Sequence, residues 1–357
     1  MPLIFTYSST MVRAVISVIV AVGLMLASSA NACGFHNYTP QPTLVDRLLA
    51  SDEIVLARNA SNNPFRYEAY EALEGNLGSP ELPFLVDSTT RHRFAIDANS
   101  AVLFARDGAY GPWQRLAYVD AALAPVLMAI MAKLPVWESG DTLDRVRFFA
   151  TLLAHPDERI HKIALRELDQ ADYGVLRSLD LAIDPVRLMS QFNAFNESEF
   201  RAIRILLLGL SDDAQLRKRL EAGVDSNVEY EGVFLGAYAT AMIELVGPEA
   251  VGLIASRYLT NPEVSLLARE LLIEAMALHG ATDDSALESS VLQAINSTLW
   301  LEPRLAGAAA RQFGARANWS LQPVLQTLLA EGTVLGTQDR QDVAQYVAYA
   351  HDAEAKR

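Results

Sequence analysis

The pattern of apolar and polar residues divides the chain into three stretches. Residues 14–27 form an apolar run of 14 residues that contains no charge. Residues 33–118 hold short apolar segments separated by turn residues, a pattern typical of strands. From residue 120 onward, apolar residues recur every three to four positions, which is the period of amphipathic helices. We therefore expect a leader at 1–32, a small β domain at 33–118, a connecting helix within 119–140 and a helical domain at 141–357.

The expected β domain begins with a short helix. Thr43 and Asp46 have the spacing of a capping box, which opens a helix that reaches Leu49. Strands are predicted at residues 53–58, 65–69, 101–105 and 113–119. The basic stretch at residues 91–93 is assigned to a strand or hairpin and is too short to bind nucleic acid. Several short strands with turn signals between them predict a small barrel or sandwich.

This block also resembles the netrin-like fold of tissue inhibitors of metalloproteinases. The resemblance rests on the order of a cysteine, Cys33, a helix at Thr43 and strands at residues 53–58 and 65–69. It implies a shared OB-type barrel shape. Those inhibitors carry several disulfides, whereas a chain with one cysteine forms none internally. Cys33 is therefore almost the only feature from which the resemblance would imply inhibitory activity.

The helical part begins with a strongly apolar segment, residues 120–134, in which Lys133 is the only charge after Asp120. We expect this connecting helix to lie buried where the two parts meet. Residues 232–243 carry no charge and are expected to form a fully buried helix. Further helices are predicted to begin at Asp141, after His155-Pro156-Asp157, at Ser198, and at Asp212 or Asp213. Further helix ends are predicted at Gly247, Gly280, Gly314 and Gly332.

Three segments of the helical part are similar to one another. Each places a polar turn with a proline before an apolar, alanine-bearing helix, at residues 155–166, 261–269 and 301–308. Pro262 and Pro303 are 41 residues apart, within the range of HEAT-type repeats, although Pro156 lies 106 residues before Pro262. Residues 141–357 thus resemble HEAT or armadillo-like repeat proteins, which implies an α-solenoid with a concave face that binds other proteins. An irregular helical domain is the alternative.

The apolar run near the N-terminus has the features of a secretory signal peptide. Arg13 precedes it, and the small residues up to Ala32 follow it, which predicts cleavage after Ala32. The run is shorter than the roughly 20 residues of a membrane span, so cleavage is favoured over an uncleaved anchor. Met11 is an alternative start to Met1, because residues 1–10 contain no charge. The protein is therefore expected to be exported, as a periplasmic or secreted protein.

Cleavage after Ala32 would make Cys33 the first mature residue, which raises the alternative of a lipid anchor at Cys33. The lipoprotein pattern prefers leucine at position −3, where this chain has Ala30, so simple cleavage is favoured. The mature chain would hold 28 basic and 43 acidic residues, a net charge of −15. That balance argues against nucleic acid as a partner. Because no later segment reaches spanning length without a charge, no membrane span is expected in the mature chain.

Candidate metal chemistry gathers at the mature N-terminus. Cys33 offers a thiolate and the terminal amine, and His36 offers an imidazole, which suits copper(I) or zinc. The segment from His155 to His161 mixes imidazoles with carboxylates. We interpret it as a helix start, in which Asp157 and Glu158 favour the N-terminal dipole. Common nucleotide-binding, zinc-protease and serine-hydrolase motifs do not occur in the sequence.

These observations predict a mostly α protein of the α+β class, with a small barrel or sandwich before an α-helical repeat domain. The expected function is an exported, non-enzymatic module that binds another protein through the helical-repeat surface. Two alternatives stay open. One is copper or zinc handling through Cys33 and His36, and the other is an enzyme whose site is assembled from distant residues. The identity of the partner and the oligomeric state do not follow from the sequence.

Overall fold

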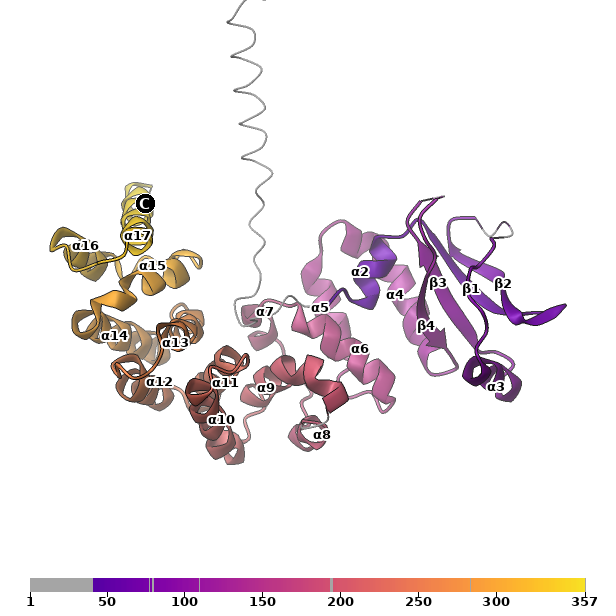
Figure 1. Cartoon of the computed structure of the whole chain (residues 1–357), viewed down its shortest axis with the longest axis horizontal. Helices are drawn as coiled ribbons and strands as arrows, with labels where there is room; N and C mark the ends of the chain where they lie inside the picture. Colours follow the sequence, from indigo (N-terminus) through magenta and orange to yellow (C-terminus); the bar gives the residue numbers. More distant parts are fainter. Residues whose placement is uncertain are drawn as a thin grey trace, which may run out of the picture.

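The computed structural model describes residues 41–356, apart from residues 77, 79, 109, 193, 194 and 283 and the side chains of residues 195 and 196. The predicted leader, its cleavage or lipidation site at Ala32 and Cys33, and the candidate metal ligands Cys33 and His36 lie outside these described residues. The expected α+β fold with mostly helical content is confirmed, because a small antiparallel sheet is followed by a long series of helices (Figure 1).

The sheet contains four antiparallel strands in the order β2-β1-β3-β4. Their bounds are β1 Glu53–Ala60, β2 Asn63–Glu74, β3 Ala101–Arg106 and β4 Gln114–Val119. Helix α2 (Leu44–Leu49) precedes the sheet and begins with the expected capping box, in which Thr43 and Asp46 exchange hydrogen bonds. The described strands form one open sheet and not the expected barrel or sandwich.

Helices on both faces explain why the sheet stays open. Ile54 and Leu103 face α2 and α4 (Leu123–Glu138) within the main core. On the opposite face, Phe104 packs in a smaller core with Phe94 of α3 (Ser88–Ile96). Each face therefore buries its apolar side chains against helices instead of a second sheet.

The basic stretch at residues 91–93 lies on α3, so its assignment to a strand or hairpin is wrong. Asp87 caps this helix by accepting a hydrogen bond from the backbone N–H of Thr90. Arg91 and Arg93 lie over the rings of Phe65 and Tyr118. A local cap and these contacts with the sheet outweigh the strand-like appearance of the segment.

The remaining helices follow one another along a curved path that leads from the sheet to the C-terminal helix (Figure 1). Their bounds are α5 Thr142–Ala150, α6 Glu158–Asp169, α7 Tyr173–Arg177, α8 Pro185–Ser190, α9 Arg201–Gly209, α10 Arg217–Glu229, α11 Leu235–Val246, α12 Pro248–Ile254, α13 Leu266–Leu278, α14 Ser285–Leu301, α15 Ala306–Gly314, α16 Gln322–Ala330 and α17 Thr337–Ala355. Short 3-10 helices lie at η1 Phe195–Phe200, η2 Ala214–Leu216 and η4 Pro303–Leu305, and a π-helical turn at η3 Ala255–Leu259.

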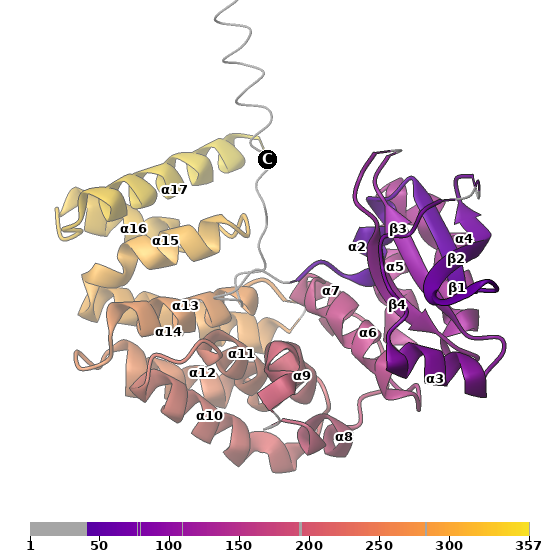
Figure 2. The ribbon, with the colours of Figure 1, turned by 45° about the vertical axis from the view of Figure 1, so that its right-hand side comes forward.

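These helices form two layers. Helices α9, α11, α13, α15 and α17 pack on one another in succession, and α10, α12, α14 and α16 cover their outer side. Figure 2 shows α15, α13 and α11 stacked one above the other. A continuous apolar core runs from the sheet through these layers to α17. In the described part of the chain, no helix is both long and apolar enough to cross a membrane.

Most predicted helix boundaries are confirmed. Asp141, Asp157 and Asp213 cap helical segments by accepting backbone hydrogen bonds. The helix that was expected to be fully buried over residues 232–243 begins only at Leu235, as α11, and eight of its twelve residues are buried. Ser198 does not start a helix as predicted, because it lies inside the 3-10 turn η1 that precedes α9.

Candidate functional site

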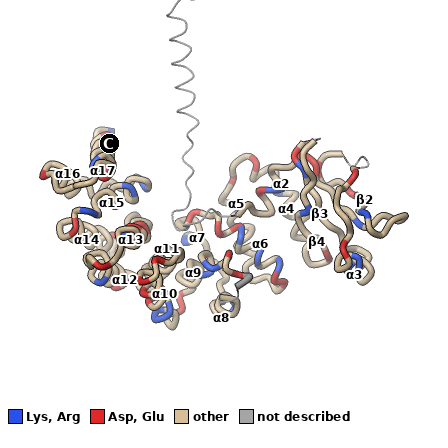
Figure 3. The backbone as a smooth tube through the Cα atoms, viewed as in Figure 1, with Lys and Arg blue, Asp and Glu red and all other residues tan. Residues whose placement is uncertain are grey.

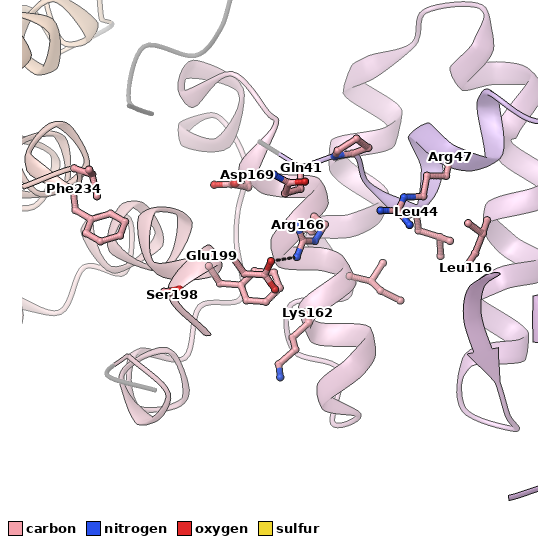
Figure 4. Close-up of a pocket in the computed structure, with 14 residues that line it drawn as sticks. Gln41, Leu44, Arg47, Leu116, Lys162, Arg166, Asp169, Ser198, Glu199 and Phe234 are labelled. Atoms are coloured by element: carbon pink, nitrogen blue, oxygen red, sulfur yellow. Dashed lines mark ion pairs between the residues drawn. The ribbon is translucent and has the colours of Figure 1, made fainter. Parts of the chain in front are cut away.

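A cleft of about 820 Å³ lies between the sheet and the first helices of the curved array. Five separate parts of the chain line it: the start of α2, strand β4, helix α6, the turn η1 and the residues just before α11. Figure 4 shows α6 in the middle, with Leu44 and Leu116 on one side and Phe234 on the other. The cleft is therefore assembled by the fold and not by one sequence motif.

Helix α6 supplies the floor of the cleft. Lys162, Ile163, Arg166 and Asp169 line the cleft from one side of this helix, where spacings of three and four residues place side chains together. The opposite side of α6 is buried in the core. Ile163 is only partly buried, so it packs against the core and also lines the cleft.

A β-bulge directs one apolar side chain of the sheet toward this floor. Leu103 pairs with Ala117 and Phe104 pairs with Arg115, so Leu116 is the extra residue of β4. Both Leu116 and Ala117 consequently pack on the helix side of the sheet, which strict alternation would not allow. The bulge thus gives the cleft an apolar wall from an edge strand.

Helix α2 forms the neighbouring part of this wall, and an ionic network fixes its position. Arg145 of α5 donates hydrogen bonds to Asp46 at 2.8 Å and to Glu167 of α6 at 2.6 Å. The same guanidinium also donates to the Thr43 hydroxyl at 2.8 Å. Because Arg145 joins the cap of α2 to α6, it fixes the position of this wall relative to the floor of the cleft.

The opposite wall combines aromatic rings with paired charges. Arg166 forms an ion pair with Glu199 at 2.6 Å (Figure 4). Its guanidinium lies 5.0 Å from the ring centre of Phe200. Val233 is half exposed beside Phe234 at the far end of the cleft. This wall therefore offers both apolar contact and hydrogen-bonding groups.

A buried carboxylate lies just behind the cleft and fixes one of its cations. Glu197 binds Lys162 at 2.5 Å and Arg204 at 2.9 Å. Burial raises the pKa of Glu197, but the hydrogen bonds and charges of Lys162 and Arg204 outweigh it and hold the pKa below its ordinary value. Glu197 is thus ionised at neutral pH and keeps Lys162 at the floor of the cleft.

Arg47 differs from the other cations of the cleft. It is exposed, and no ion pair joins it to another described residue. Figure 3 shows positive and negative residues distributed together over α6 and its neighbours. Among the described residues, the cleft therefore combines charge pairs with one cation that forms no ion pair.

The structure gives the His155–His161 segment a structural role. The His155 ring accepts a hydrogen bond from the backbone N–H of Asp157 at 3.0 Å. His161 is buried, its Nδ1 lies 2.8 Å from the carbonyl of Leu153, and burial lowers its pKa. Glu158 pairs with Arg187 at 3.0 Å. These side chains build the helix start, as the sequence interpretation proposed.

Metal binding at Cys33 and His36 stays a prediction, since both residues lie outside the described part. Across that part, no three side chains of His, Cys, Asp or Glu gather as metal ligands. The sequence alone did not predict the cleft, because lining residues such as Arg47, Leu116 and Arg166 come from separate elements. The only local signal was the mixed face of α6, where charged residues flank Ile163. Comparison of the chain with protein-family models, with curated proteins and with solved structures found no match.

Proposed function

We propose that this protein is an exported interaction module that binds a segment of another protein in the cleft beside α6. The observation that carries this proposal is the composition of the cleft. Apolar side chains such as Leu116, Ile163 and Val233 lie beside the ion pair of Arg166 and Glu199. Protein interfaces combine apolar contacts and polar groups in this way.

The size and origin of the cleft also favour a protein segment. It continues from the β4 edge across α6 to the start of α11, so a ligand in it would contact parts of the chain more than 100 residues apart. Arg47, which forms no ion pair with another described residue, provides a cation near one end, which suits a carboxylate of the bound segment. The HEAT-like pattern of the sequence supports the same class of function, and the signal-peptide pattern supports export.

Site-specific photo-crosslinking in the full chain tests this proposal. A photoreactive residue replaces Val233, which is 50% exposed and lines the cleft, or Val186, which is 73% exposed on α8 and does not line it. We expect one defined product in the exported fraction from position 233 and none from position 186. Equal labelling at both positions would show that capture is not specific to the cleft.

A charge substitution then tests the captured partner after purification. Val233→Glu places a carboxylate at the rim beside Phe234, and we expect it to weaken binding at least about tenfold, because an apolar contact is replaced by a charge. Val186→Glu is the matched control and should leave affinity unchanged. The proposal would be wrong if both variants bound the purified partner like the unmodified chain.

A further inference from the structure

A second cavity lies near the C-terminal end of the array, between α15 and α17. Its volume is about 310 Å³, and none of its described lining residues belongs to the cleft beside α6. Three aromatic residues line it: Trp319, Tyr346 and Tyr349. This cavity therefore needs an explanation of its own, independent of the proposed interaction cleft.

The aromatic walls are held in place but remain open. The Trp319 ring centre lies 5.1 Å from that of Tyr346 and 6.2 Å from that of Tyr349, with interplanar angles of 63° and 61°. The buried Tyr346 hydroxyl donates to the carbonyl of Asn318 at 2.6 Å and accepts from the N–H of Leu321 at 3.1 Å. Tyr349 is half exposed. A ligand can thus reach a pre-formed group of rings.

A glycine keeps space free beside these rings. Gly314 is the last residue of α15, and a Cβ at this position would lie 3.2 Å from the Tyr346 ring and 3.7 Å from the Trp319 ring. Any larger residue would therefore fill part of the cavity. The rest of the α15 wall is formed by alanine side chains next to Arg311.

The polar end of the cavity carries an excess of negative charge. Arg311 binds Glu270 at 2.8 Å, Asp339 at 3.0 Å and Asp342 at 2.6 Å, so three carboxylates meet one guanidinium. Asp342 itself lines the cavity. This surplus favours a cationic ligand and disfavours an anion.

Aromatic faces select among cations. A cation within about 6 Å of a ring centre is attracted by the ring quadrupole. A primary ammonium is strongly hydrated and needs hydrogen-bond acceptors when it leaves water. A trimethylammonium group has no N–H donor, so apolar walls and ring faces suit it better. We propose that the cavity between α15 and α17 binds a trimethylammonium group, from a small molecule or a trimethylated lysine side chain.

Titration of the full chain with choline tests this proposal. The readout is the NMR signal of the Trp319 indole N–H, one of four tryptophans in the chain. We expect saturable shifts with a dissociation constant on the order of millimolar, because each exposed ring contributes little. A peptide that contains trimethyllysine forms the second arm, and the tighter ligand identifies the source of the group.

Two control ligands separate charge from shape. The uncharged isostere of choline, 3,3-dimethylbutanol, should bind at least about fivefold more weakly, and so should ethanolamine, which carries a primary ammonium. Equal affinity for the isostere would overturn the proposal, since the charge would not be recognised. Equal affinity for ethanolamine and choline would show that the cavity does not select a methylated ammonium. If choline caused no saturable shift of the Trp319 signal, the proposed site would be wrong.

Variants locate the site independently. Tyr349→Leu removes an exposed ring and should weaken choline binding about two- to fivefold. Gly314→Ala should reduce binding at least as much, because its methyl group occupies the space beside Tyr346 and Trp319. Trp300→Phe changes an exposed aromatic residue of α14 outside the cavity and should have no effect. Unchanged choline affinity in both cavity variants would contradict the proposal.

Discussion

The absence of a single methyl group lets α9 and α11 pack closely. Gly209 ends α9, and a Cβ at this position would lie 2.5 Å from the Cα of Ala241 in α11. Atoms that are not bonded to each other cannot approach so closely, so a side chain would force the two helices apart. The glycine is thus a packing requirement of the inner layer and not a helix end alone.

We therefore predict that Gly209→Ala destabilises the protein, although alanine is the better helix former. Overpacking should cost about 1–3 kcal/mol, which exceeds the gain of roughly 1 kcal/mol from helix propensity. Gly252→Ala is the matched control, because Gly252 is exposed in α12 and a Cβ there meets no atom within 4 Å. Urea unfolding followed by circular dichroism should show a lower midpoint for Gly209→Ala and an equal or higher one for Gly252→Ala.

Local residue rules predicted the helix starts well, because a cap depends on neighbours in sequence. Asp157 accepts a hydrogen bond from Arg159 N, two residues ahead, and this geometry can be read directly from the spacing. The same rule failed at Ser198, since the segment folds as a 3-10 turn that carries Glu197 to Arg204 and Lys162. A buried ion pair between elements overrode a favourable local pattern there.

At the scale of elements, Glu244 of α11 joins three helices. It accepts a hydrogen bond from the Tyr173 hydroxyl at 3.2 Å and from Arg177 Nε at 2.9 Å, both in α7. The Nε2 atom of His279, at the end of α13, lies 3.1 Å from the same carboxylate. The sequence predicted a helix end at Gly280. The structure confirms this end, because His279, directly before Gly280, caps α13, and it adds the contact of His279 with Glu244.

We predict that Glu244→Gln lowers the free energy of unfolding by about 1.5–3 kcal/mol, the usual range for a hydrogen bond to a charged group. The amide cannot accept from Tyr173 and Arg177 as a carboxylate does, and it places no negative charge beside His279. Glu249→Gln is the control, since Glu249 is an exposed partner of Arg217 and such surface pairs contribute little. A similar loss of unfolding free energy in both variants would show that the contact among the three helices stabilises the protein no more than a surface ion pair does.

The contribution of Glu244 should also depend on pH. Burial raises its pKa, but the hydrogen bond and charge of His279 and the charge of Arg177 outweigh burial and hold the pKa below the ordinary value. The ionised form is therefore favoured by folding, and its stabilisation is complete above the unfolded pKa of roughly 4.3. It is lost as the pH falls through the lower folded pKa. The difference in unfolding free energy between the native chain and Glu244→Gln should shrink below about pH 4.

At the scale of the whole molecule, the sequence predicted the types of element better than their assembly. The change from strand-like to helical periods near residue 120 agrees with the structure, because periodicity reflects which side of each element is buried. The open sheet was not predicted, since strands alone do not show whether a helix or another sheet covers each face. The cleft was missed for the same reason, as the bulge at Leu116 depends on pairing with β3.

The layered arrangement predicts unequal stability along the array. Helix α11 packs against α9, α10, α12 and α13, and eight of its twelve residues are buried. Helix α17 packs mainly on α15 and α16, and three of its nineteen residues are buried. In an array whose helices contact mainly their neighbours, the helix at the end has the fewest interactions to lose when it opens.

We therefore predict that amide hydrogens of α17 exchange at least about tenfold faster than those of α11 under native conditions, after correction for intrinsic rates. Hydrogen–deuterium exchange with mass spectrometry of peptic peptides measures this difference. The outer helix α14 is the internal control, because it lies within the array and should exchange more slowly than α17. Equal protection of the amide hydrogens of α17 and α11 would contradict this prediction. It would show that the continuous core makes the whole array open as a single unit, so that α17 does not open on its own.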